Sequence, residues 1–126
     1  LFIALGPKAT AKAPGVVHIG VRYSNEMSLA FNKYGKKGPG ATIELVAPDG
    51  TLVYSLENLQ IGRNLMPLQG IENGSYIARL SAPDFRTKEV PIIVEGRMIN
   101  PPKGVDLDKG TYAAYNMIGV RFEPID

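Results

Sequence analysis

Few residues in this chain have the types and spacing that could support chemistry. His18 is the single histidine, and histidine is the usual general base beside a nucleophilic serine or cysteine. It alternates with Val17 and Ile19, so its side chain should lie on the opposite face of a strand from theirs. The sequence has no cysteine and no Gly-x-Ser-x-Gly turn that would expose a serine. We interpret His18 as a surface residue and predict no catalytic residues and no enzymatic activity.

A second candidate is the stretch from Asp106 to Gly110, whose Asp-x-Asp-x-Gly pattern opens many calcium-binding loops. Such a loop takes a bidentate glutamate at its twelfth position, where this chain has Met117. Lys109 places a repelling positive charge inside the stretch. We therefore interpret the segment as a polar turn before the last strand, and we predict neither a metal nor another cofactor.

Tyrosine side chains are the remaining candidates, because an exposed ring can stack against a ligand such as a sugar. Tyr112 and Tyr115 stand beside a predicted long loop and form the candidate ligand-binding pair, with packing in the core or at its rim as the interpretation that we favour. Tyr76 follows the turn pair Asn73-Gly74 at the start of a predicted strand. From there its hydroxyl can donate to the backbone of the preceding connection, so we predict a structural tyrosine corner at Tyr76.

The composition is typical of one globular domain. The chain has 126 residues, of which 44% are hydrophobic and 21% charged, and it carries 14 glycines and 10 prolines. No stretch approaches the ~20 apolar residues of a membrane helix, so no membrane span is predicted. The net charge is +2, and the local group Lys33, Lys36 and Lys37 is small. We interpret that group as a solvated loop and predict no nucleic-acid partner.

Alternating apolar residues predict an all-β, immunoglobulin- or fibronectin-III-like antiparallel sandwich. The turn Pro48-Asp49-Gly50 joins two such stretches and predicts a hairpin over residues 41–56. Pro91 interrupts a later strand and predicts a sheet edge or a bulge there, because proline cannot donate to the ladder. Strands are expected near residues 17–21, 43–47, 52–56, 64–68, 76–80, 90–94 and 118–122.

The remaining segments leave alternatives open. Residues 24–34 fit a strand and also a short helix, and we favour the strand because the neighbouring elements are β. Residues 96–110 are expected to form a long loop. We assign residues 1–126 to one domain with a core over about 16–123, in which residues 1–15 form an N-terminal strand or a linker that follows a removed signal peptide.

One short sequence occurs twice. Ile19-Gly20-Val21-Arg22-Tyr23 returns as Ile118-Gly119-Val120-Arg121-Phe122. Five residues are few for a repeat, so we interpret the similarity as chance or as two similar strand environments. The alternative is that a second copy of the domain begins after about residue 110.

The stretch 41–95 resembles secreted sandwich domains of Bacteroidetes-type bacteria. The shared features are a strand ending at Asp49-Gly50, a following strand with Val53-Tyr54, and a later Gly74-Ser75-Tyr76. Type IX secretion C-terminal sorting domains and an uncharacterised periplasmic sandwich family have this pattern. The chain continues some thirty residues beyond the point where sorting domains end.

The resemblance implies a periplasmic, extracellular or cell-surface location. Together with the absence of a catalytic motif, it leads us to expect a non-catalytic structural or protein-interaction module. Its partner would be another protein or a neighbouring domain of a larger envelope protein, bound through the sheet edge expected at Pro91 and the long loop over 96–110. The alternative is an accessory carbohydrate-binding domain that uses Tyr112 and Tyr115.

Overall fold

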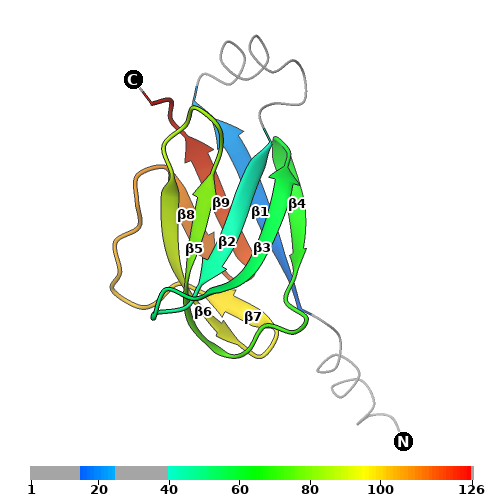
Figure 1. Cartoon of the computed structure of the whole chain (residues 1–126). Coiled ribbons are helices and arrows are strands. Elements are labelled where there is room, and N and C mark those ends of the chain that lie inside the picture. The colour runs from blue at the N-terminus through cyan, green and yellow to red at the C-terminus, as the bar shows by residue number, and fades with distance from the viewer. Residues whose placement is uncertain (1–14, 25–39, 126) are drawn as a thin grey trace, which may run out of the picture.

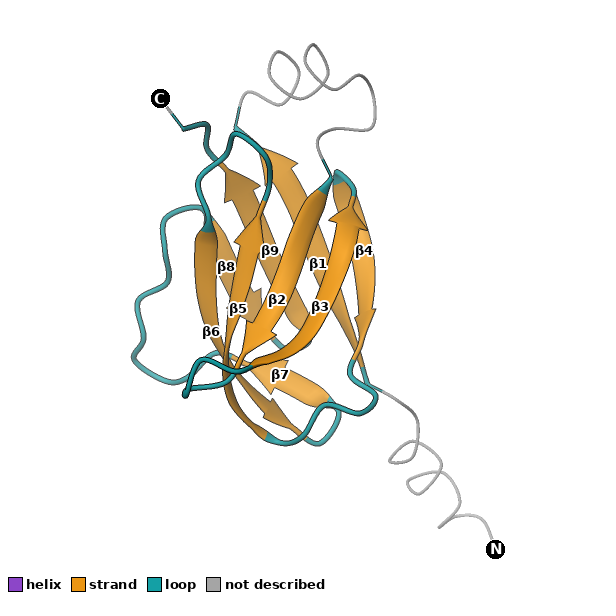
Figure 2. Ribbon diagram, viewed as in Figure 1, coloured by secondary structure: helices purple, strands orange, loops and turns teal. Residues whose placement is uncertain are grey.

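The computed structural model describes residues 15–24 and 40–125, which form nine strands in two sheets that pack face to face (Figure 1). No helix occurs among these residues, which confirms the all-β expectation (Figure 2). The strands are β1 (Val16–Tyr23), β2 (Ala41–Val46), β3 (Leu52–Leu59), β4 (Gly62–Pro67), β5 (Gly74–Ser81), β6 (Lys88–Glu95), β7 (Met98–Asn100), β8 (Thr111–Ala114) and β9 (Met117–Phe122).

The larger sheet, here called sheet B, has the order β3-β2-β5-β6-β7 with antiparallel neighbours throughout. The predicted hairpin over 41–56 is confirmed as β2 and β3, although β3 continues to Leu59. Asp49 stabilises its turn, because the carboxylate accepts a hydrogen bond of 2.9 Å from the Thr51 N–H. This bond lowers the pKa of the Asp49 carboxyl below its ordinary value.

The smaller sheet, sheet A, has the order β4-β1-β9-β8. Its central strands β1 and β9 run parallel, whereas β4 and β8 pair antiparallel with them, so the expectation of an antiparallel sandwich is corrected at this pair. The two copies of the repeated pentapeptide lie side by side in this central pair, with Ile19 opposite Ile118 and Tyr23 opposite Phe122. Residues after 110 therefore complete the same sandwich, and the alternative of a second domain copy was wrong. The shared sequence reflects a shared position, apolar toward the core and Gly or Arg toward solvent.

The core lies between the inward faces of the two sheets. Strand β1 contributes Val17, Ile19 and Val21, all with 0% exposure, and β9 contributes Ile118, Val120 and Phe122. An aromatic cluster closes one end of the core, where the Tyr23 ring lies 4.7 Å from Phe85 and 5.3 Å from Phe122. The alternation of buried and exposed residues along β1 and β9 fixes which side chains face outward from sheet A.

Several local predictions are corrected. The expected loop over 96–110 contains β7, and β8 was not predicted. Pro91 lies in β6, which is neither an edge strand nor bulged at this position. The proline is tolerated because pairing with β7 starts only at Ile93, and the N–H of Glu89 points away from β5 to the Asp108 carboxylate, so the nitrogen of Pro91 points the same way. The alternatives for 24–34, apart from Ser24, and those for residues 1–14 lie outside the described residues, as does the lysine group at 33–37.

Candidate functional site

Two glycines lie side by side at the centre of the outer face of sheet A. Gly20 of β1 pairs with Gly119 of β9, and their row continues to Arg63 on β4 and Tyr112 on β8. Neither glycine has a positive φ, so the backbone conformation does not require glycine at either position. A Cβ at Gly119 would contact the Tyr112 side chain at 3.6 Å, whereas a Cβ at Gly20 would meet nothing within 4 Å. The backbone at Gly20 is therefore open to solvent without a packing reason.

This bare backbone forms the floor of an open concavity of about 680 Å³. Arg22 and Arg121 stand at one end, and Tyr112 forms a side wall. A second concavity of about 280 Å³ shares Gly20 and Arg22 with the first and extends toward Arg63. No acidic side chain lines either concavity among the described residues. The outer face of sheet A is thus a shallow, positively charged surface.

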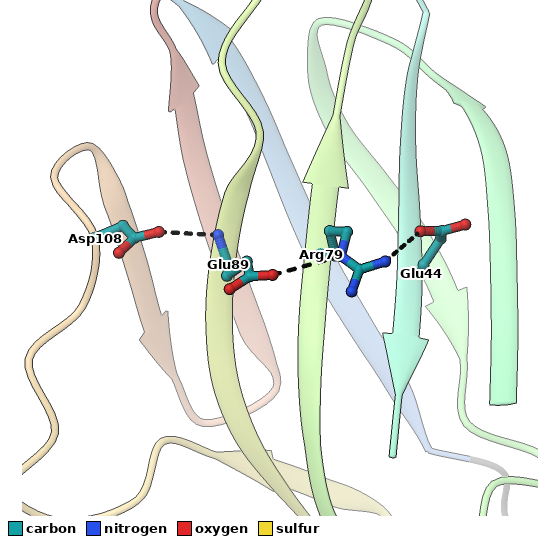
Figure 3. Close-up of polar contacts among 4 residues, drawn as sticks. All are labelled: Glu44, Arg79, Glu89 and Asp108. Carbon is teal, nitrogen blue, oxygen red and sulfur yellow. Dashed lines mark hydrogen bonds and ion pairs between the residues drawn. The ribbon is translucent and has the colours of Figure 1, made fainter. Parts of the chain in front are cut away.

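The arginines of this surface are arranged differently from the arginine of the opposite face. Arg22 and Arg121 are direct neighbours in the parallel pair, and no ion pair of either is found among the described residues. On the outer face of sheet B, Arg79 lies between Glu44 and Glu89, 3.4 Å from a carboxylate oxygen of each (Figure 3). Like charges on adjacent strands repel, so the pair on sheet A is unfavourable without an anion between them.

The predicted ligand-binding tyrosines are both exposed, Tyr112 by 54% and Tyr115 by 66%. Only Tyr112 lines the concavity, because it projects from β8 beside Gly119, whereas Tyr115 lies in the turn between β8 and β9. The structure therefore separates the two residues that the sequence grouped as a pair. His18 lies on the same outer face, beside the smaller concavity.

The residues of the rejected calcium pattern have structural contacts. The Asp108 carboxylate accepts from the Glu89 N–H at 3.1 Å, and its carbonyl accepts from the Thr111 N–H at 3.0 Å. Asp106 is exposed. Among residues 15–24 and 40–125, no three carboxylate or imidazole groups gather into a set that could hold a metal ion.

Tyr76 makes the contact expected of a tyrosine corner. Its hydroxyl donates a hydrogen bond of 2.6 Å to the Glu72 carbonyl, four residues upstream, and only 8% of the residue is exposed. Glu72 lies in the connection between β4 in sheet A and β5 in sheet B. The bond therefore fixes the course of a chain segment that crosses from one sheet to the other.

A buried lysine of sheet B binds the chain segments that precede β8 and follow β9. Lys88, at the start of β6, has a side chain only 7% exposed, and its ammonium donates to Glu123 Oε1 at 2.8 Å and to the Lys109 carbonyl at 2.7 Å. The hydrogen bond from Lys88 holds the pKa of the Glu123 carboxyl below its ordinary value. These bonds satisfy the buried charge and attach the loop before β8 to sheet B, so we assign Lys88 a structural role.

Sequence reasoning did not single out Arg22, Arg63, Arg121 or the two glycines as a site. Each arginine comes from a different strand, and their proximity depends on the parallel pairing of β1 with β9. The repeated pentapeptide was the only available signal, because it carries both Gly-x-Arg pairs.

Comparison of the chain with protein-family profiles, curated protein sequences and solved structures found no match. In the part of the chain that the structure describes, there is no helix with the length and apolar character needed to cross a membrane.

Proposed function

We propose that this chain is a non-catalytic binding module of a secreted, periplasmic or cell-surface protein, and that it recognises its partner through the outer face of sheet A. The observation that carries the proposal is the open concavity of about 680 Å³ whose floor is bare backbone at Gly20 and whose end is occupied by Arg22 and Arg121. Glycine in the interior of a strand weakens it and often marks a place where a ligand or another backbone approaches closely. The location rests on the resemblance of residues 41–95 to secreted sandwich domains.

We further propose that the sandwich is immunoglobulin- or fibronectin-III-like. In such domains strands B and E are neighbours in one sheet, strands C, F and G are neighbours in the other, and a tyrosine corner lies at the start of strand F. Here β1 and β4 pair as B and E would, and β2, β5 and β6 pair as C, F and G would. Tyr76 occupies the corner position in β5. In this interpretation β9 pairs with β1 on the side away from β4, where strand A would lie.

The proposed recognition surface differs from the surface expected from the sequence. The protein-interaction prediction relied on an exposed edge at Pro91 and a long loop at 96–110, and both features differ in the structure. The outer face of sheet A replaces them as the proposed recognition surface.

Two variants test the proposed surface. Gly20→Val places a branched side chain in open space and fills the floor, while valine suits a strand and should leave the fold intact. Arg79→Gln removes one positive charge from the opposite sheet and serves as the control. Wild type and both variants are applied to arrays of glycans and of peptides of both charges. We expect at least one ligand class to bind wild type and Arg79→Gln but not Gly20→Val. Ligands that all bind Gly20→Val as well as wild type would refute the assignment of this face.

A further inference from the structure

We propose that the ligand of the outer face of sheet A is an acidic oligosaccharide whose uronate carboxylates pair with Arg22 and Arg121. This inference rests on the proposed function and names the chemical class that the same face recognises. Three independent features of the surface lead to it: its charge, its floor without side chains and its aromatic wall.

The charge indicates an anion. Arg22 and Arg121 occupy equivalent positions on parallel neighbours, so their backbones are separated by one strand spacing of about 4.8 Å. Both side chains are exposed, and neither forms an ion pair among the described residues, in contrast to Arg79 on sheet B. The pKa of the Glu123 carboxyl is nonetheless lowered first by the hydrogen bond from Lys88 and further by the charge of Arg121. A carboxylate between the two guanidinium groups would relieve their repulsion, and guanidinium groups bind carboxylates with paired hydrogen bonds.

The floor indicates a flat ligand that lies on the sheet. The row Arg63, Gly20, Gly119 and Tyr112 crosses all four strands, a width of about 14 Å at three strand spacings. The two glycines give this row a centre without side chains, and nothing lies within 4 Å of where a Cβ of Gly20 would project. A stretch of sheet without side chains admits the face of a pyranose ring, whereas an extended peptide would normally add to a strand edge.

The wall supplies a surface for stacking. Tyr112 is 54% exposed, and its side chain rests against Gly119, where a Cβ would lie 3.8 Å from Cδ2. A tyrosine has an apolar ring face and a polar hydroxyl, a combination suited to the apolar face and the hydroxyls of a sugar. At the other end of the row, Arg63 provides a further positive charge for a second uronate.

The test uses nuclear magnetic resonance titration of the whole 126-residue chain, in which the backbone amides of Gly20 and Gly119 report on the floor directly. The probes are oligogalacturonate and a hyaluronan oligosaccharide, which are two uronate chains with different linkages. Fully methyl-esterified oligogalacturonate is the matched neutral probe. Polyglutamate and single-stranded oligodeoxythymidine are the other anionic chains.

We expect at least one uronate chain to bind, with shift changes at both glycines and an affinity that falls as salt is added. Arg22→Gln and Arg121→Gln should each weaken binding by about tenfold, the equivalent of one charge-assisted contact. Gly20→Val should abolish binding, Tyr112→Ala should weaken it more than Tyr112→Phe, and Arg79→Gln should leave it unchanged. The esterified probe should not bind.

Two results would overturn the inference, and they differ in what they leave standing. Polyglutamate or oligodeoxythymidine could bind wild type more tightly than both uronate chains and fail to bind Gly20→Val. In that case the proposed ligand class is wrong, and the proposed binding face is retained. If neither uronate chain perturbs the two glycine amides, the inference fails, and the array experiment above decides separately whether the face binds another ligand.

Discussion

A methyl group added at Gly15 should destabilise the fold, whereas a methyl group added at Gly20 should not. A Cβ at Gly15 would lie 2.3 Å from the Arg97 carbonyl oxygen and 2.8 Å from its carbonyl carbon. An ordinary carbon–oxygen contact is about 3.3 Å, so the two backbones would have to separate by about 1 Å. That movement strains the 2.8 Å bond from the Leu68 N–H to the Gly15 carbonyl and the 3.1 Å bond from Asn116 Nδ2 to the Arg97 carbonyl.

These contacts set the size of the effect. Overpacking against backbone costs about 1–3 kcal/mol, and weakening the two hydrogen bonds adds about 1 kcal/mol in total. Replacing glycine by alanine also restricts the unfolded chain, which returns about 0.4–1 kcal/mol. The expected net loss for Gly15→Ala is about 2 kcal/mol. With a urea dependence of about 2 kcal/mol per molar, the unfolding midpoint should fall by about 1 M.

The assay is urea unfolding followed by far-ultraviolet circular dichroism and by tyrosine fluorescence, since the chain has no tryptophan. Gly20→Ala is the matched control, because its methyl group meets nothing within 4 Å. It should leave stability unchanged or raise it by about 0.4–1 kcal/mol. The reasoning fails if Gly15→Ala unfolds within about 0.5 kcal/mol of wild type, the ordinary range of a surface substitution, or if Gly20→Ala is equally destabilised.

Two further predictions concern the structural contacts. Tyr76→Phe keeps the ring and removes the 2.6 Å hydrogen bond to the Glu72 carbonyl. The free energy of unfolding, measured in urea, should therefore fall by about 1 kcal/mol. Glu123→Gln should destabilise the protein at neutral pH, because the carboxylate that pairs with buried Lys88 is lost. Since the folded pKa of Glu123 lies below its ordinary value of 4.5, the contribution of Glu123 is complete above that pH. It disappears as the pH falls through the lowered folded value, so the variant and wild type should converge in stability in acid.

Each of these has a control. Tyr115→Phe, at a tyrosine exposed by 66%, should not change stability, and an equal loss there would show that the effect at the corner is not specific. Glu57→Gln, on the exposed side of β3, should leave the pH dependence as in wild type. If the free energies of unfolding of wild type and Glu123→Gln differ as much in acid as at neutral pH, the proposed role of the charged pair is contradicted.

The sequence was sufficient to predict strands in which apolar and polar residues alternate over five or more positions. Strong alternation and turn chemistry located the hairpin of β2 and β3, as well as β1, β5, β6 and β9. It did not locate β7, which has three residues, or β8, where Ala113 and Ala114 give almost no contrast between the two faces. The turn between β8 and β9 also lacks glycine, and Asn116 supplies the positive φ instead.

The candidate site depends on information that one strand does not contain. Because side chains alternate between the two faces of a strand, the sequence predicts that Arg22 and Arg121 both face outward. It does not predict that their strands are neighbours. The repeated pentapeptide was recognised, but similar strand environments do not imply adjacent strands. Tyr112 was named as a ligand-binding candidate although core or rim packing was favoured, and its position beside Gly119 follows only from the pairing of β8 with β9.

The parallel pairing of β1 with β9 also constrains the order in which the molecule can be made. Partners at the centre of sheet A are about a hundred residues apart in sequence. During synthesis β1 leaves the ribosome long before β9, and until then one side of β1 has no neighbouring strand and part of its apolar face has no cover. Such long-range pairing slows folding and exposes nascent chains to aggregation. Sheet A can therefore close only after Phe122 has left the ribosome, so the sandwich cannot fold strand by strand in the order of its synthesis.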